Sequence, residues 1–159
     1  HLYKIPLTMF RFFTVYGPWG RPDMALFKFT KNILLKKKID LFNFGNHKRD
    51  FTFVDDVAYI IQKLIKRPPK KNKTPFRILN IGKGSQTKLT DYLKEIEKNL
   101  GIKSKVNLLP LQLGDIYETK SNIENLKKII KLKKFTSVKR GVKLFIDWYK
   151  NYHNKNNAK

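Results

Sequence analysis

The spacing of apolar residues along the chain predicts alternating strands and amphipathic helices. Residues 7–13 form a nearly continuous apolar and β-prone run, which is typical of a strand buried on both faces. Shorter runs at residues 39–44 and 51–54 flank a glycine-containing turn, so we expect a hairpin or a close pair of strands there. Further strands are expected at residues 76–81 and 106–109.

Apolar residues three and four positions apart predict helices in the segments between these strands. The first helix is expected over residues 24–36, and Gly101 is expected to end a later helix as its C′ glycine. The residues expected to cap the helix N-termini share short polar side chains: Asp23, Asp55 or Asp56, Thr87, Asn122, and Thr136 or Ser137.

The order of these elements indicates an α/β fold, and 159 residues are enough for one domain with a core. A buried strand over residues 7–13 needs neighbours on its edges and cover on both faces, which no earlier residues supply. Later strands could supply them, but a missing N-terminal half is the simpler explanation. The start at His1, without an initiating methionine or a signal-peptide pattern, looks like a cut inside a longer protein.

The composition and the spacing of residue types exclude several kinds of site and segment. The chain has no cysteine, which excludes disulfides, thiolate metal sites and cysteine nucleophiles, and which fits a cytoplasmic protein. No apolar run is long enough to cross a membrane, so no membrane span is expected. The histidines His1, His47 and His153 show no metal-ligand spacing, so no metal site is expected.

The charge is extreme, because 35 lysines and arginines against 12 aspartates and glutamates give a formal net charge of +23. One interpretation is binding to nucleic acid or to a membrane surface. We favour the other, a compositional bias with the lysines on solvated faces, because no nucleic-acid-binding signature accompanies the charge. No specific nucleic-acid partner is therefore expected, although a positive field would attract a doubly charged nucleotide sugar.

Residues 11–24 contain the most informative pattern in the chain. An apolar strand stops at Gly17, and a rigid loop then holds Arg21 between a glycine and a proline. A guanidinium fixed in this way suits two-bond capture of a carboxylate or phosphate, and Thr14 offers a hydroxyl where open α/β sheets bind ligands. On the loop pattern alone, a surface arginine in a turn remains the favoured interpretation.

Three other patterns have both a functional and a structural interpretation. Arg49 either binds an anion or forms a surface ion pair with its neighbour Asp50, and the sequence favours neither. Asp55 and Asp56 resemble a carboxylate pair for acid–base chemistry, but helix capping is the favoured role. Residues 82–85 follow a predicted strand and precede a helix, but they match no phosphate-loop fingerprint.

Ordered motifs cover nearly the whole chain, at residues 11–24, 45–56, 80–82, 109–115 and 136–142 and at Trp148-Tyr149. Together they resemble the C-terminal half of the NAD-dependent epimerase/dehydratase family, which belongs to the extended short-chain dehydrogenases/reductases. The likeness is strongest to the UDP-glucuronate 4-epimerases. It depends most on the block Thr-Val-Tyr-Gly-Pro-Trp-Gly-Arg-Pro-Asp-Met at residues 14–24.

The resemblance implies the C-terminal part of a Rossmann-like extended short-chain dehydrogenase fold. Residues 1–153 would form this substrate-binding portion with its smaller α/β lobe, and residues 154–159 a frayed tail. On the sugar side, the resemblance implies that Arg21 clasps the uronate carboxylate with help from Thr14. It also implies that the backbone of Phe13 lies near the nicotinamide of NAD.

On the nucleotide side, the resemblance implies that Arg49 binds the diphosphate of a UDP-sugar. Asp115 would accept hydrogen bonds from the ribose hydroxyls, with Gln112 beside it. Phe42 and the backbone around Leu41 would line the uracil pocket. These roles suit the residue types, because a carboxylate accepts from paired hydroxyls and an arginine donates to phosphate oxygens.

Enzymes of this family transfer a hydride from the sugar C4 to NAD and return it to the other face of a 4-keto intermediate. We expect the catalytic Tyr-x-x-x-Lys pair and the glycine-rich NAD loop upstream of His1, so no catalytic residue is assigned in this chain. Tyr59 and Lys63 match the spacing by chance. The complete enzyme is expected to be a homodimer, and this chain alone to be inactive.

Two alternative functions stay open from the sequence. The chain could be a fragment of another nucleotide-sugar epimerase, dehydratase or decarboxylase, since these enzymes share much of the same fold. It could instead be a non-catalytic basic binding protein.

Overall fold

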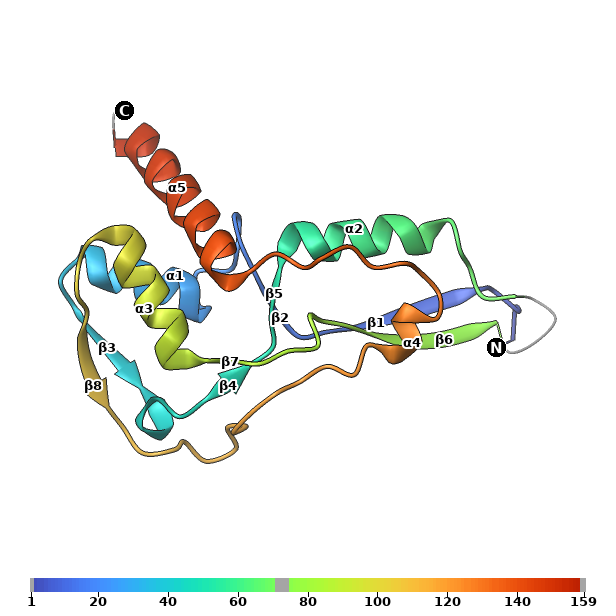
Figure 1. Ribbon diagram of the computed structural model, residues 1–159, viewed down its shortest axis with the longest axis horizontal. Coiled ribbons are helices and arrows are strands. Elements are labelled where there is room, and N and C mark those ends of the chain that lie inside the picture. Colours follow the sequence, from blue (N-terminus) through green and yellow to red (C-terminus); the bar gives the residue numbers. More distant parts are fainter. Residues whose placement is uncertain (1, 71–74, 158–159) are drawn as a thin grey trace.

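The computed structural model describes residues 2–70 and 75–157 as two lobes joined by short strand pairs (Figure 1). In one lobe, β1 (Leu7–Phe12) pairs in parallel with β6 (Phe76–Ile81). Helix α2 (Val54–Ile65) and the short α4 (Glu124–Lys127) pack on this pair through one apolar cluster. The lobe therefore has the strand–helix layering of an α/β fold.

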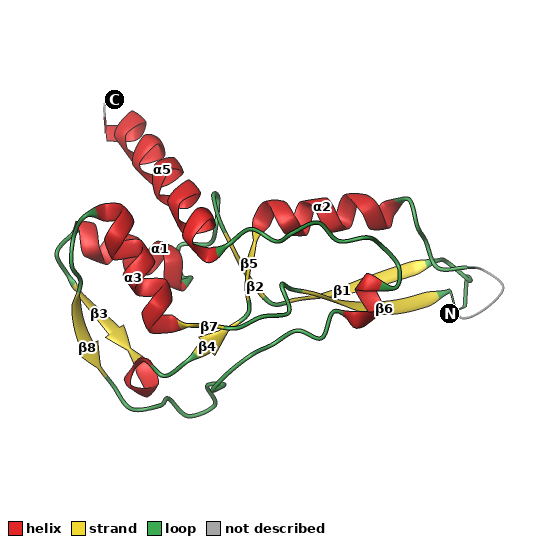
Figure 2. Ribbon diagram, viewed as in Figure 1, coloured by secondary structure: helices red, strands yellow, loops and turns green. Residues whose placement is uncertain are grey.

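The second lobe is a group of helices beside another parallel pair of strands (Figure 2). Here β3 (Lys38–Leu41) pairs with β8 (Lys105–Leu108). The helices α1 (Ala25–Leu34), α3 (Leu89–Leu100) and α5 (Val138–Asn157) bury their apolar faces against one another. This packing forms the larger of the two cores.

Two short strand pairs connect the lobes. β2 (Thr14–Tyr16) pairs in parallel with β5 (Phe51–Phe53), and β4 (Lys48–Arg49) pairs antiparallel with β7 (Thr87–Lys88). At Phe13 the chain changes partner, because its N–H donates to the Ile81 carbonyl and the next N–H, of Thr14, donates to the Asp50 carbonyl, each at 3.2 Å. The end of β1 is thereby fixed beside β5, where the candidate site lies.

The expected hairpin over residues 39–44 and 51–54 is wrong. The first of these strands ends at Leu41 and pairs with β8, whereas β5 pairs with β2. The chain leaves the sheet through the 3-10 turn η1 (Phe42–Gly45), in which Asn43 and Phe44 both have a φ of 51°. A left-handed backbone at two successive residues cannot continue a strand, and apolar spacing alone does not reveal it.

Three of the expected N-caps are also wrong. The residues that precede α1, α2 and α3 are Met24, Phe53 and Lys88, and none of them makes a side-chain cap hydrogen bond. The polar side chains predicted as caps have other partners or places: Asp23 binds Arg21, Asp55 and Asp56 lie inside the first turn of α2, and Thr87 lies in β7.

Other helix-end predictions are confirmed. Gly101 follows α3 with a φ of 71°, and its N–H donates to the Glu97 carbonyl. The Ser137 hydroxyl accepts from the Arg140 N–H at the start of α5. The prediction of Asn122 as the cap of α4 is wrong by one residue, because the N-cap position is Ile123, although the Asn122 side chain accepts from the Glu124 N–H at 3.0 Å. Helix α5 continues to Asn157, and residues 158–159 of the predicted tail lie outside the described residues.

The prediction that the first strand is buried on both faces is wrong for this chain. The side chains of Leu7 and Met9 are each 48% exposed, although Phe10 packs on the cluster around α2. In the described part of the chain, β1 pairs on one edge only, with β6. One face of the β1–β6 pair is therefore apolar and open.

Candidate functional site

A hollow of about 490 Å³ lies where the two lobes meet. It is bordered by the end of β1–β2, helix α1, strand β3, turn η1 and the strand β4. Four residues that the sequence proposed as site residues line it together: Thr14, Phe42, Arg49 and Asp115. The first and the last of them are more than a hundred residues apart, and the strand pairs of the junction bring them to one place.

Arg49 and Asp115 form the polar centre of this hollow. Nη2 of Arg49 donates to Oδ1 of Asp115 at 3.1 Å, and Nη1 donates to the carbonyls of Lys48 and Tyr117, also at 3.1 Å. The Asp115 carboxylate in addition accepts the N–H of Ile116 at 2.8 Å. Both side chains are thus held in one orientation while the Asp115 side chain stays 32% exposed to the hollow.

His47 is a site residue that the sequence reasoning missed. Its imidazole is buried, and its Nε2 lies 3.3 Å from Oδ2 of Asp115 without hydrogen-bond alignment. Burial lowers the pKa of His47, the Arg49 charge lowers it further, and Asp115 acts in the opposite direction. The signal was available, because residues two apart on an extended segment, such as His47 and Arg49, share one face.

Arg21 lies at the edge of the site and is already bound to a carboxylate. Its Nε donates to Oδ1 of Asp23 at 3.1 Å, and its Nη2 donates to the other oxygen. This hydrogen bonding lowers the pKa of Asp23. Arg21 lines a smaller hollow that shares Thr14 and Met24 with the larger one. Arg21 and the Arg49 centre are therefore neighbours in space.

The remaining predicted site residues are placed less directly. Gln112 is exposed, and its carbonyl accepts the Asp115 N–H at 3.1 Å, but within the described chain its side chain lines neither hollow. Leu41 is buried in the core, and its carbonyl accepts from Leu109. Phe13 uses both backbone groups internally, since its carbonyl accepts the Val15 N–H at 2.9 Å.

The neighbour of Arg49, Asp50, is fully buried, and among the described residues it has no ion-pair partner. Its carboxylate accepts the backbone N–H groups of Lys83, Gly84 and Ser121 at 2.9–3.0 Å, together with the hydroxyls of Thr52 and Ser121. In the glycine-containing loop over residues 82–85, the N–H groups of Lys83 and Gly84 thus donate to this carboxylate, whereas a phosphate loop would donate to a phosphate. Asp50 fixes the strand that carries Arg49.

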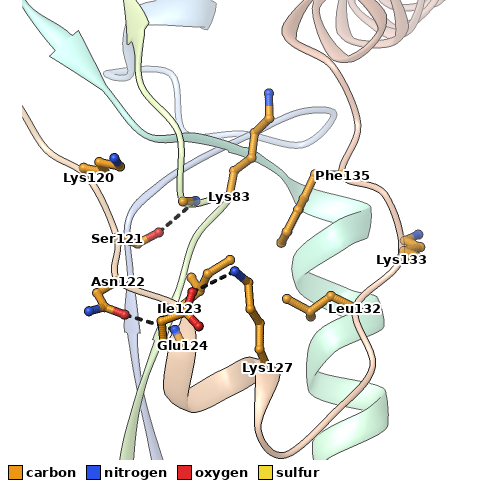
Figure 3. A pocket seen from close by; sticks show the side chains of 11 residues that line it. Lys83, Lys120, Ser121, Asn122, Ile123, Glu124, Lys127, Leu132, Lys133 and Phe135 are labelled. Carbon is orange, nitrogen blue, oxygen red and sulfur yellow. Dashed lines mark hydrogen bonds and ion pairs between the residues drawn. The ribbon is translucent and has the colours of Figure 1, made fainter.

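Another hollow, of about 620 Å³, lies elsewhere, between the loop after β6 and the segment around α4 (Figure 3). Ile123, Leu132 and Phe135 face its interior, whereas the Lys83 amine points away and Lys127 reaches Glu124 at 2.7 Å. None of the site residues proposed from the sequence lines it. Within the described residues, no group of three or more histidines and carboxylates is placed to hold a metal ion.

Comparison with known proteins places the chain in a family. The sequence profile of the "NAD dependent epimerase/dehydratase family" matches residues 1–82, more than half of the chain. The chain belongs to this family. It is 45% identical to Protein CapI of Staphylococcus aureus over 98% of the chain, and 41% identical to a probable UDP-glucuronate 4-epimerase of Rhizobium meliloti over 94%. It covers 50% and 48% of those proteins, so it spans about half the length of these curated relatives.

Solved structures agree with this placement. The chain superposes with a TM-score of 0.82 and 30% identity on UDP-glucuronic acid 4-epimerase from Bacillus cereus, a structure that contains UDP-glucuronic acid and NAD. The match covers 93% of this chain and 46% of that one. The predicted fold class, part of a Rossmann-like extended short-chain dehydrogenase with a smaller α/β lobe, is confirmed. No helix in residues 2–70 and 75–157 is long and apolar enough to cross a membrane.

The family uses NAD, and the described residues do not fit this cofactor by themselves. Helices α1, α2 and α3 start after Met24, Phe53 and Lys88, not after the glycine-rich turn that holds a dinucleotide pyrophosphate. Phe13, the residue predicted to lie near the nicotinamide, has its N–H and carbonyl engaged within the chain.

Proposed function

We propose that this chain is the substrate-binding portion of an NAD-dependent UDP-sugar 4-epimerase and that the sugar is a uronate. In the complete enzyme the reaction would interconvert UDP-glucuronate and UDP-galacturonate through a 4-keto intermediate. Residues 1–153 would supply the binding portion, and the cofactor loop and the catalytic tyrosine would lie outside this chain. The complete enzyme would act as a homodimer.

The nucleotide side of the proposal rests on the fixed Arg49–Asp115 pair. An arginine whose Nη atoms are held by two carbonyls and a carboxylate is oriented before a ligand arrives, which lowers the entropy lost on binding. Its charge suits a diphosphate, and Asp115 suits the paired hydroxyls of a ribose. Phe42, which lines the same hollow, would contact the base.

The proposed preference for a uronate rests on the contact between Arg21 and Asp23, which supports the proposal most directly. Arg21 binds the Asp23 carboxylate with two donors at the edge of the hollow, and both side chains are exposed. An exposed ion pair contributes little free energy, so an incoming carboxylate can replace Asp23 at small cost. A sugar without a carboxylate offers Arg21 no such partner.

Tyr59 and Lys63 have no part in this proposal. The Lys63 amine lies 5.4 Å from the centre of the Tyr59 ring on α2, and the Lys133 amine lies 4.7 Å from the same ring. The hollow that these three residues line contains none of the site residues. Nothing in this arrangement gives the tyrosine the role of a base.

The test is calorimetric titration of the full chain with UDP-glucuronate and with UDP-glucose. We expect saturable binding of both nucleotides, with UDP-glucuronate the tighter, and loss of that preference in Arg21→Ala. Arg140→Ala, an exposed arginine on α5, is the matched control and should keep the preference. Equal affinities in the unaltered chain, or turnover to UDP-galacturonate by this chain with NAD, would refute the proposal.

A further inference from the structure

An exposed cluster of aromatic rings joins the Arg21 loop to the last helix, α5. The centre of the Trp19 ring lies 5.2 Å from that of Trp148 and 5.3 Å from that of Tyr152. Trp148 and Tyr152 are four residues apart on α5, and their rings stack at 5.4 Å with 22° between the planes. Trp19 and Trp148 are the two tryptophans of the chain.

The rest of the loop makes its hydrogen bonds internally. Throughout the described chain, the hydrogen bonds of residues 18–23 stay within residues 17–24. The Gly20 N–H donates to the Gly17 carbonyl at 3.2 Å, and the Met24 N–H donates to the Arg21 carbonyl at 3.1 Å. The contact of Trp19 with α5 therefore connects the loop tip to a separate element. Figure 1 shows the loop between β2 and α1 beside the start of α5.

Trp19 has an unfavourable backbone conformation for its side chain. Its φ is 61°, in the left-handed region, and its side chain is 74% exposed, so burial does not hold the residue there. A residue with a strained backbone keeps that conformation only where contacts with the surrounding structure hold it. For Trp19 these contacts are with the rings of Trp148 and Tyr152.

Helix α5 is a rigid support for this contact. Its inner residues Val142, Phe145 and Ile146 are almost completely buried in the larger core. Gly141 approaches Tyr16 so closely that an added Cβ would lie 2.2 Å from the phenol oxygen. The outer rings of α5 therefore have a fixed position relative to β2, where Thr14 lies.

We propose that Trp19 and Trp148 form an aromatic clamp that positions Arg21 for the carboxylate of the substrate. This inference rests on the proposed function, because it assigns a selectivity role to residues that touch no ligand. Trp148 and Trp19 are positioning residues: they hold the loop, and Arg21, two residues beyond Trp19, makes the contact. Loosening the clamp lowers uronate affinity and leaves the Arg49 side of the site unchanged.

The first arm of the test needs no ligand. Two tryptophan rings in contact give an exciton-coupled circular dichroism couplet, and with two tryptophans in the chain a Trp–Trp couplet can arise from this pair alone. We expect the signal in the full chain and its loss in Trp19→Phe and in Trp148→Phe equally. We also expect faster hydrogen exchange at the Gly20 and Met24 amides in Trp148→Ala. Absence of the signal in the unaltered chain would overturn the clamp.

The second arm measures selectivity. Trp148→Ala should weaken UDP-glucuronate binding by about 2–10-fold, the effect of losing the one aromatic pair that Trp148 makes with the loop, and should leave UDP-glucose binding unchanged. Trp148→Phe should restore most of the preference, and Ile65→Ala, another exposed apolar residue, should keep it. In the background of Arg21→Ala, the substitution of Trp148 should have no further effect.

The two arms separate the possible failures. If the unaltered chain shows the tryptophan signal but binds both nucleotides equally, the proposed function of Arg21 is wrong. The selectivity role of the clamp is then overturned with it, although the contact between the two rings stands. If the chain prefers UDP-glucuronate and Trp148→Ala keeps that preference, the clamp is refuted and the proposed function stands. An equal loss of affinity for both nucleotides would show a merely structural role and would also refute the clamp.

Discussion

Replacing Asp50 is the most informative perturbation of the frame that holds the site. Its carboxylate accepts five hydrogen bonds on two oxygens and is fully buried. Each bond to a charged acceptor contributes about 1.5–3 kcal/mol on its own, but bonds that share an oxygen are not additive. We therefore expect Asp50→Ala to lower the free energy of unfolding by about 3–5 kcal/mol.

A graded series tests this reasoning by urea denaturation followed by circular dichroism. Asp50→Asn keeps one acceptor oxygen and turns an NH₂ group toward backbone donors, so its effect should be close to that of alanine. Ser121→Ala removes one hydroxyl, which lies 2.5 Å from Oδ2, and should cost about 1–2 kcal/mol. Asp55→Asn, an exposed acid on α2, is the control and should change stability by less than about 0.5 kcal/mol.

One result of this series would refute the role assigned to Asp50. A loss below about 1 kcal/mol for Asp50→Ala would mean that water or other groups replace the carboxylate without cost. The idea that Asp50 fixes the strand carrying Arg49 would then be wrong.

Four further outcomes follow from the structure. Tyr16→Phe should leave stability unchanged or raise it by up to about 1 kcal/mol in urea denaturation, because the buried Tyr16 hydroxyl has no hydrogen-bond partner within the described chain. Gly141→Ala should cost about 1–3 kcal/mol, since its Cβ would meet the Tyr16 ring, and an unchanged midpoint would contradict this close contact. Burial and the Arg49 charge lower the pKa of His47 in the folded state, so the unfolded chain binds more protons. Stability should therefore fall as the pH drops through the range where an unperturbed histidine titrates, about 6.5. His47→Gln should flatten this dependence in denaturation at several pH values. Asp23→Asn should tighten UDP-glucuronate binding by no more than about 5-fold in calorimetry, because it removes the exposed competitor for Arg21, and weaker binding would contradict that role.

The sequence predicts where the helices and strands of this fold lie better than it predicts which strands pair. Helices with clear periodicity are confirmed, as shown by Leu26, Phe29 and Ile33, which lie on the buried face of α1. Strand pairing was not predictable, because β3 and β8 are separated by more than sixty residues and apolar runs carry no information about register. The predicted caps of α1, α2 and α3 failed because the polar side chains near these helix starts have other partners or places. Asp23 binds its near neighbour Arg21, Asp56 accepts the distant Thr136 N–H, and Thr87 lies in β7.

The sequence motifs predicted which residues belong to the site, and the structure shows which of them lie together. Thr14, Phe42, Arg49 and Asp115 line one hollow, although their roles toward a ligand stay predictions. The pairing of Arg21 with Asp23 was not foreseen, since both residues had been given other roles in the sequence analysis.

We propose that the hollow with Arg49 and Asp115 binds the nucleotide of a uronate-bearing UDP-sugar. Hydrogen-exchange mass spectrometry of the full chain with saturating UDP-glucuronate is the direct test of this binding. We expect slower exchange in the segments around Thr14, Arg49 and Asp115, with the protection at the Arg21 loop lost when UDP-glucose replaces UDP-glucuronate. Protection confined to the hollow around Ile123 and Phe135, or no protection anywhere, would contradict it.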